Sequence, residues 1–176
     1  GVSRVAFYID RVGLSRWLLG VSHSAFGLRN CALFAKFRAD GVKGRDEIGV
    51  LFAQLTIGET HFFRGDDQFA AIRDIVLPEI LERKQSSKKL RIWSAGCATG
   101  AEPYSLAIML TQALGDAIAG WQIGIEATDL NRRYLAQAEE GKFRAWALRG
   151  VSEEMKRECF SNEGLVWTIH PRYKQW

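Results

Sequence analysis

The sequence has few of the residues that build metal centres or disulfide frameworks. It holds three cysteines and three histidines in 176 residues. The cysteines, at positions 31, 97 and 159, are odd in number and far apart, and no pair has metal-ligand spacing. The pattern argues against a disulfide scaffold, predicts no metal site, and favours a reducing, cytoplasmic setting.

Long apolar runs are also lacking. No segment approaches the roughly 20 apolar residues that cross a bilayer. The apolar start, residues 2–19, is interrupted by four charged side chains and does not have the pattern of a signal peptide. Nearly half of the residues are apolar and a quarter are charged, which predicts a soluble globular protein without membrane insertion.

Positive charge is concentrated at the beginning of the chain. Residues 1–50 contain eight Lys and Arg against four Asp and Glu, which accounts for the whole net charge of +4. Such a segment fits an acidic protein surface or nucleic acid, and it equally fits a solvated helix face without a partner. Aromatic residues are not interleaved with the basic ones as single-strand binding requires, so no nucleic-acid partner is expected.

The first third of the chain is expected to be helical. Residues 1–40 carry apolar side chains at mixed three- and four-residue spacing, and residues 47–55 predict a further short helix. The glycines between them, at 41 and 44, indicate a loop. We therefore expect a small, basic, helical segment over residues 1–54, ahead of a second domain over residues 55–176.

The helix predicted from residue 66 should have a capped start and a disturbed middle. Asp66 or Asp67 can cap it, and its apolar face includes Phe69 and Ile80. Pro78 should kink the helix or end its regular hydrogen bonding.

Strands and helices alternate after residue 89. The expected elements are a strand at 90–95, a glycine-rich turn, a helix opened by Pro103, a strand at 121–128, helices at 131–140 and from Ser152, and an extended run at 164–169. This order predicts an α/β fold with a doubly wound, parallel, Rossmann-like sheet. Because such sheets have more strands than this, the chain is expected to be truncated at its C-terminus.

The turn after the first of these strands consists of small residues, Gly96-Cys97-Ala98-Thr99-Gly100. Its spacing does not match the G-x-G-x-x-G rule, and no Lys-Ser/Thr pair follows as in a phosphate loop. A nicotinamide oxidoreductase is therefore disfavoured. The turn fits a nucleoside with an amino-acid tail, such as S-adenosylmethionine, and Asp129 after the next strand can accept hydrogen bonds from ribose hydroxyls.

Three separated segments share a pattern with one protein family. They are LTIGETHFFR at 55–64, WSAGCATGAEPYS at 93–105 and ATDL at 127–130. Together with GKFRAWALRG at 141–150, they resemble the CheR family of chemoreceptor glutamate O-methyltransferases, which use S-adenosylmethionine. The resemblance covers residues 55–176 and implies an S-adenosylmethionine-dependent methyltransferase domain that is only partly present.

The resemblance implies roles for five residues in cofactor binding. Thr60 and Arg64 would contact the methionine part of the cofactor, with Arg64 near its carboxylate. Glu102 would reach the amino group, and Asp129 the ribose. Gly96 would let the backbone approach the cofactor closely.

Three further expectations concern neighbouring positions. Gly58 stands where the family commonly has asparagine, so one side-chain hydrogen bond to the cofactor is expected to be absent. Phe62 and Phe63 are expected in the core rather than against adenine. Arg83 is the candidate catalytic residue, as an arginine that orients the substrate carboxylate.

The resemblance implies a cytoplasmic enzyme of chemotaxis adaptation. It would transfer a methyl group from S-adenosylmethionine to glutamate carboxylates on the helical cytoplasmic region of a chemoreceptor, and the basic N-terminal segment would contact that acidic surface. The alternative is a non-catalytic regulatory module that binds S-adenosylmethionine or its product, S-adenosylhomocysteine.

Overall fold

The computed structural model describes residues 5–7 and 56–175. The helices expected within residues 8–40 and 47–55, and the basic charge of that segment, lie outside this part of the chain. Residues from Gly58 onward group with the first strand in one compact unit. Within the described ranges, no helix combines the length and the apolar composition that a bilayer crossing requires.

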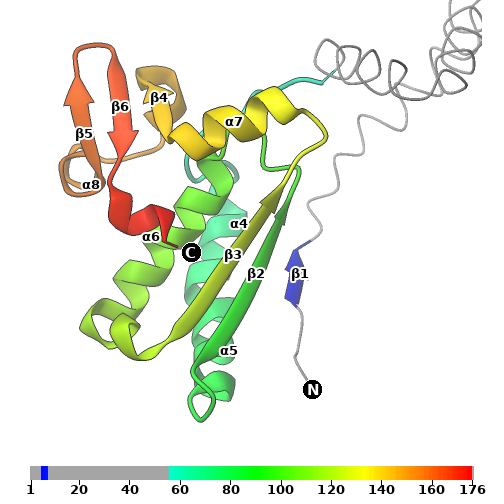
Figure 1. Ribbon diagram of the computed structural model, residues 1–176. Coiled ribbons are helices and arrows are strands. Elements are labelled where there is room, and N and C mark those ends of the chain that lie inside the picture. The colour runs from blue at the N-terminus through cyan, green and yellow to red at the C-terminus, as the bar shows by residue number, and fades with distance from the viewer. Residues whose placement is uncertain (1–4, 8–55, 176) are drawn as a thin grey trace, which may run out of the picture. The chain divides into compact units, whose positions relative to one another are not determined.

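Three parallel strands form the central sheet (Figure 1): β1, Val5–Phe7; β2, Lys89–Ala95; and β3, Gln122–Thr128. β2 lies in the middle, with Ile92 opposite Val5 on one side and Ile125 on the other. β1 shows that the helical prediction is wrong for residues 5–7. Pairing with the edge of β2 outweighs the local helical spacing of this short segment.

Helices pack on one side of β2. They are α4, Asp66–Ala71; a π-helix, Ile72–Val76; α5, Leu77–Lys84; and α6, Ala101–Leu114. Leu90 and Ile92 of β2 are buried in an apolar cluster with Ile80, Leu106 and Leu110. Burying each such side chain contributes about 1.5–3 kcal/mol to folding, so this cluster fixes the orientation of α6 on the sheet.

Pro78 disturbs its helix as predicted. The regular hydrogen bonding widens into the π-helix just before Pro78 at the start of α5. Proline has no N–H to donate to residue 74, so an added residue in the preceding turn costs little. The predicted cap is wrong, because α4 begins after Gly65, with φ 89°, and Asp66 and Asp67 occupy its first turn without capping it.

The opposite side of β2 is exposed. Burial alternates along the strand, and Trp93 on the outer side remains 45% exposed. There, Arg91 pairs with Glu126 of β3 at 3.8 Å, and Trp93 Nε1 donates to Thr128 Oγ1 at 3.0 Å. The parallel sheet and its helices confirm the α/β class. That helices cover both faces of the sheet, as in a doubly wound fold, stays a prediction.

Helices α7 and α8 start where the sequence predicts. In α7, Arg132–Glu140, the side chain of Asn131 accepts from Arg133 N at 3.0 Å, and Gly141 ends the helix with φ 62°. In α8, Glu153–Cys159, Ser152 Oγ accepts a hydrogen bond from Met155 N at 3.2 Å. These short polar side chains satisfy backbone donors that the first helical turn leaves unpaired.

A small antiparallel sheet is formed by one strand that precedes α8 along the chain and two that follow it (Figure 1). Its strands are β4, Lys142–Arg144; β5, Phe160–Glu163; and β6, Val166–Ile169, in the order β4-β6-β5. The extended run predicted at 164–169 contains β6. Short 3₁₀-helices at Gly115–Gly120, Ala145–Leu148 and Pro171–Lys174 complete the described part of the chain.

Phe62 joins this small sheet to α6. Its side chain is fully buried, with ring centroids 4.8 Å from Phe143 and 5.0 Å from Phe160 in edge-to-face packing. The prediction that Phe62 belongs to the core is confirmed. Since Phe62 directly precedes Phe63 and Arg64, this core contact also fixes the segment expected to bind the cofactor.

Candidate functional site

The glycine-rich turn leads from β2 into α6 at the carboxyl end of the parallel strands. Gly96 and Cys97 both donate backbone hydrogen bonds to Thr128 O, at 2.7 and 3.0 Å, so the turn is tied to the end of β3. Three of its residues have positive φ: Gly96 at 77°, Ala98 at 49° and Gly100 at 91°. This tightly curled backbone presents its N–H groups to the neighbouring strand end.

Asp129 lies beside that turn and is held by backbone donors. Ala98 N donates to Asp129 Oδ2 at 2.9 Å, and Asn131 N donates to Oδ1 at 2.8 Å. The carboxylate is thereby fixed between the glycine turn and α7. Each carboxylate oxygen has two lone pairs, so Asp129 can still accept hydrogen bonds from a pair of ligand hydroxyls.

The two glycines of the turn serve different purposes. A Cβ atom on Gly96 would meet no atom within 4 Å, so the backbone there borders open space. A Cβ atom on Gly100 would lie 2.8 Å from Cβ of Ala138, because α6 and α7 approach closely at that point. Gly96 therefore allows a ligand to approach the backbone, whereas Gly100 allows two helices to pack.

Glu102 occupies the first turn of α6. Its Oε1 accepts a hydrogen bond of 2.6 Å from Ser94 Oγ, and Ser94 is buried near the end of β2. A carboxylate in the first turn of a helix is also favoured by the helix dipole. The hydrogen bond orients the Glu102 side chain toward the carboxyl end of the strands, where a cationic ligand group could reach it.

The segment Thr60–Arg64 passes along the start of α6. Phe63 N donates to Ser105 Oγ at 2.9 Å, and Ser105 Oγ donates to Ala101 O at 2.7 Å. Phe63 has a positive φ of 55°, an unfavourable conformation for a residue with a side chain, so these contacts hold the segment in place. The structure thus brings the segment that carries Thr60 and Arg64 to the same end of α6 as Glu102.

Arg83 is not part of this arrangement. It lies in the last turn of α5, where it pairs with Glu79 at 3.6 Å. The chain then turns into the beginning of β2 at Lys89, whereas the glycine turn follows the other end of that strand (Figure 1). The position of Arg83 therefore argues against the catalytic role that the sequence suggested for it.

Arg149 is a residue that the sequence analysis missed. Its Nη2 lies 2.7 Å from Nδ1 of His61 and 3.7 Å from a carboxylate oxygen of Glu59, and its guanidinium covers the Trp146 ring at 4.1 Å. Burial lowers the pKa of His61, and the charges of Arg149 and Arg64 lower it further. The neutral imidazole accepts a hydrogen bond from Arg149, and this pair holds the segment beside Thr60.

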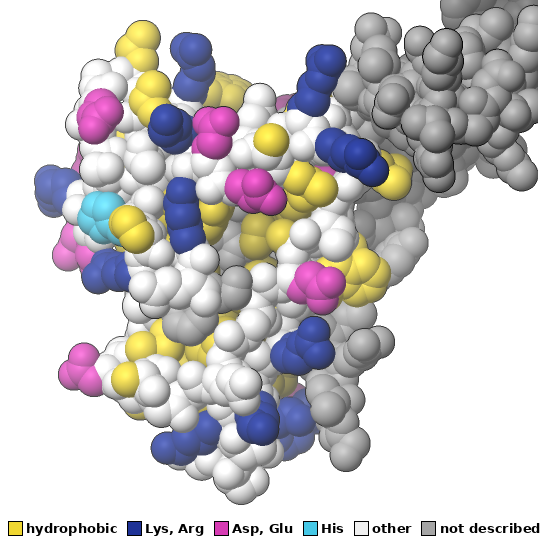
Figure 2. Space-filling model, in the orientation of Figure 1, with side chains coloured by type: hydrophobic (Ala, Val, Ile, Leu, Met, Phe, Trp, Pro, Cys, Tyr) yellow, Lys and Arg dark blue, Asp and Glu magenta, His cyan; other side chains and the backbone are white. Residues whose placement is uncertain are grey.

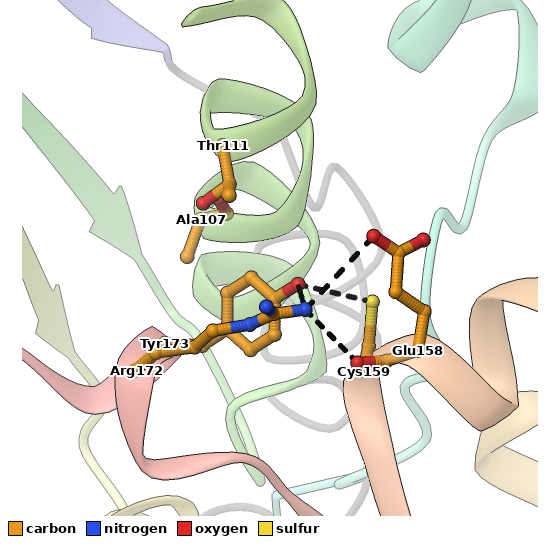
Figure 3. Close-up of polar contacts among 6 residues, drawn as sticks. All are labelled: Ala107, Thr111, Glu158, Cys159, Arg172 and Tyr173. Atoms are coloured by element: carbon orange, nitrogen blue, oxygen red, sulfur yellow. Dashed lines mark hydrogen bonds and ion pairs between the residues drawn. The ribbon is translucent and has the colours of Figure 1, made fainter. Parts of the chain in front are cut away.

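A second polar cluster lies between the end of α8 and the last described 3₁₀-helix (Figure 3). Cys159 Sγ is 3.2 Å from Tyr173 Oη, and Arg172 Nη2 donates to the same oxygen at 2.8 Å and to Glu158 O at 2.9 Å. Burial, and then the hydrogen bond with Cys159, raises the pKa of Tyr173 to about 12. The phenol therefore stays protonated, and the cluster fastens the last described 3₁₀-helix to the end of α8.

An apolar cavity lies next to this cluster rather than at the glycine turn. It has a volume of about 270 Å³ and is bordered by α6, β3, α7 and the last 3₁₀-helix, with Tyr104, Ile125, Leu135 and Tyr173 in its wall. Neither Gly96 nor Asp129 lines it. Within residues 5–7 and 56–175, no group of three or more His, Cys, Asp or Glu side chains could hold a metal ion.

The fold and the arrangement at the strand ends define the class of protein. A family model described as "CheR methyltransferase, SAM binding domain" matches residues 58–176. The chain belongs to the CheR methyltransferase family, and its cofactor is S-adenosylmethionine. The open space at Gly96 and the remaining acceptor capacity of Asp129 fit the close approach of a nucleoside.

Several curated relatives are named as chemotaxis methyltransferases. The chain is 36% identical over 160 residues to a probable chemotaxis protein methyltransferase of Rhizobium etli, across 90% of this chain and 53% of the relative. It is 36% identical over 121 residues to a chemotaxis protein methyltransferase of Listeria monocytogenes, across 69% and 44%. It is 37% identical over 123 residues to chemotaxis protein methyltransferase 1 of Pseudomonas aeruginosa, and the match covers 66% of this chain and 44% of the relative. The chain therefore spans about half the length of these relatives.

Proposed function

We propose that this protein transfers the methyl group of S-adenosylmethionine to glutamate side-chain carboxylates of a chemoreceptor. The observation that carries the proposal is the position of Asp129, which the glycine turn holds through Ala98 N at the carboxyl end of the parallel strands. Membership of the CheR family supports the reaction class. The names of the relatives support a role in chemotaxis.

Each of the five cofactor residues is assigned a task, and Thr60 would contact the methionine part of the cofactor. Asp129 accepts hydrogen bonds from the ribose hydroxyls, and the backbone at Gly96 lies close to the nucleoside. Glu102, held by Ser94, attracts the amino group of the methionine part. Arg64 follows Phe63, whose backbone is fixed on α6. Its Nη1 donates to Glu59 O, and its remaining N–H donors would pair with the carboxylate of the same amino acid.

The reaction needs alignment more than it needs proton transfer. When bound, the cofactor supplies a sulfonium-linked methyl group that is ready for displacement. A substrate glutamate, with an ordinary pKa of about 4.3, is already a carboxylate at neutral pH. Asp129, Glu102 and Arg64 would hold the cofactor so that this methyl group is offered to one oxygen of the substrate carboxylate.

The protein's contribution is therefore to orient both reactants and to exclude water. Orientation of two reactants can lower a barrier by roughly 7–11 kcal/mol. No general base is required. The Nδ1 lone pair of His61 already accepts a hydrogen bond from Arg149, and burial lowers the pKa of the imidazole, so His61 suits a structural role. An arginine that orients the receptor carboxylate would have to approach from the strand ends, where Arg83 does not lie.

The receptor partner is inferred from charge. On the face drawn in Figure 2, basic and acidic side chains are interspersed. Residues 1–50, by contrast, carry the entire net charge of +4. An acidic helical surface of a chemoreceptor would therefore be attracted mainly to the N-terminal segment.

A non-catalytic module that binds S-adenosylmethionine or S-adenosylhomocysteine is the second candidate. The observation in its favour is Gly58, which supplies no side chain where the resemblance to the family leads us to expect asparagine. Both candidates predict cofactor binding, and only the first predicts methyl transfer to a receptor.

Calorimetric titration with S-adenosylhomocysteine, beside an Asp129→Ala variant, tests the site that both candidates share. Saturable binding by the wild type that the variant loses supports the site. Equal binding by both proteins would contradict the role of Asp129 and, with it, the proposal.

A further inference from the structure

Gly58 and Tyr134 meet in a contact that leaves no room for a side chain at position 58. A Cβ atom built on Gly58 would lie 2.4 Å from Cζ of Tyr134 and 2.7 Å from both Cε2 and Oη. Real Cβ atoms essentially never approach other heavy atoms closer than 3.0 Å. The ring of Tyr134 therefore lies against the backbone of Gly58. A side chain at position 58 would have to displace this ring, which is the outer end of a half-buried side chain.

Tyr134 lies in the first turn of α7, close to the carboxylate expected to bind ribose. Asn131 N donates to Asp129 Oδ1 at 2.8 Å, and Tyr134 N donates to Asn131 O at 3.0 Å. Two hydrogen bonds, one to the Asp129 carboxylate and one within the backbone, thus connect Asp129 to the tyrosine through Asn131. Gly58, on the other side of the contact, is two residues before Thr60. The contact joins the two segments to which the proposed function assigns the cofactor.

We propose that Tyr134 is a positioning residue of the cofactor site: its ring holds the segment from Gly58 to Thr60 against the start of α7. This inference rests on the proposed function. An aromatic side chain packs a large rigid surface with only two rotatable bonds, so it orders a neighbouring segment at small entropic cost. A segment ordered in advance does not have to be ordered when the cofactor binds, and the affinity for S-adenosylhomocysteine rises accordingly.

Gly58 and Tyr134 then depend on each other, and changing either residue alone should lower the affinity for S-adenosylhomocysteine. In Gly58→Ala, the added methyl group displaces the ring and the segment together. In Tyr134→Ala, the segment loses the surface against which it packs. In the double variant, the alanine at position 58 no longer meets a ring, so the second change adds no further loss.

The test is a set of calorimetric titrations with S-adenosylhomocysteine. We expect Gly58→Ala and Tyr134→Ala each to raise the dissociation constant about tenfold. The double variant should bind no more weakly than Tyr134→Ala, and Tyr134→Phe, which keeps the ring, should stay within about threefold of the wild type. Gly124→Ala on β3 is the matched control, because a Cβ atom there would meet nothing within 4 Å and should leave binding unchanged.

Three results would overturn the inference. They are wild-type affinity in Gly58→Ala or Tyr134→Ala, a loss in Tyr134→Phe as large as in Tyr134→Ala, and losses in the double variant that simply add. Thermal melting of each sample confirms that it is folded at the titration temperature. If the wild type itself does not bind S-adenosylhomocysteine, the proposed function fails together with this inference, whereas binding that is unaffected by these variants refutes the inference alone.

Discussion

Replacing Asp129 by asparagine should weaken the binding of S-adenosylhomocysteine while the protein remains folded. The substitution keeps the shape of the side chain but removes its charge and one acceptor. In the wild type, Oδ1 accepts from Asn131 N at 2.8 Å and Oδ2 accepts from Ala98 N at 2.9 Å. An asparagine amide group must therefore direct its NH₂ toward one of these N–H donors.

The size of the effect follows from these contacts. A hydrogen bond to a charged group contributes about 1.5–3 kcal/mol, which corresponds to roughly ten- to hundredfold in a dissociation constant. Because the ribose would lose its charged acceptor, the dissociation constant should rise by about that factor. The backbone donor left facing the amide should lower the free energy of unfolding by about 1–3 kcal/mol.

Calorimetry and urea unfolding measure the two effects separately. Asp116→Asn, on the exposed 3₁₀-helix Gly115–Gly120, is the control, since it removes the same charge away from the strand ends. Binding by Asp129→Asn that equals the wild type would refute the reasoning. An equal loss in Asp116→Asn would show that net charge, rather than the position of Asp129, governs binding.

Three other predictions concern the core, pH dependence and the receptor. Phe62→Ala should lower the free energy of unfolding by about 3–5 kcal/mol, because the ring is fully buried between two aromatic neighbours. The measurement is urea unfolding, and a decrease below about 1 kcal/mol would contradict the prediction. Because the pKa of His61 is lowered in the folded state, its neutral form contributes stability that is fully present above pH 6.5 and is lost as pH falls toward the folded pKa. In His61→Gln, the melting temperature should therefore depend less on pH than in the wild type. An unchanged pH dependence would contradict this prediction. Arg29, Lys36 and Arg38 would be replaced by Glu together. This variant should capture less of a chemoreceptor cytoplasmic fragment in a pull-down but bind S-adenosylhomocysteine as the wild type does. Equal loss of both would contradict this division of roles.

Local chemistry made some elements predictable from the sequence. The boundaries of α7 could be read because Asn131 caps its start and Gly141 adopts the left-handed conformation at its end. Ser152 marked the start of α8 in the same way. Pro78 predicted a disturbance in its helix, although the form that it takes, a π-helix, depends on packing against the sheet. These signals lie within a few residues of the feature that they specify.

Features set by distant contacts were not predictable. β1 exists because its backbone pairs with β2, 87 positions away in the sequence, and no local period reveals this pairing. The antiparallel sheet β4-β6-β5 depends on pairing such as Phe143 with Trp167. Gly65, with a left-handed φ, precedes α4 in place of the expected aspartate cap, and two residues earlier Phe63 N is fixed on Ser105, 42 positions away.

In the candidate site, too, the features that local sequence specifies could be predicted, and those that depend on distant contacts could not. The glycine turn and Asp129 could be predicted because a parallel sheet brings consecutive strand ends together, and the structure joins them through Ala98. The role predicted for Arg83 depends only on its place in the sequence upstream of β2, and in the structure Arg83 lies near the start of that strand, whereas the glycine turn follows its end. Arg149 contacts His61 across 88 positions, so no nearby residue signalled it.

Methyl transfer itself is the most direct test of the account. The protein would be incubated with a chemoreceptor cytoplasmic fragment and S-adenosylmethionine that carries a tritiated methyl group. We predict that label enters the receptor as an ester that alkali releases as methanol, and that Asp129→Asn reduces the incorporation. Cofactor binding without any transfer to the receptor would contradict the enzyme assignment and favour the non-catalytic binding module.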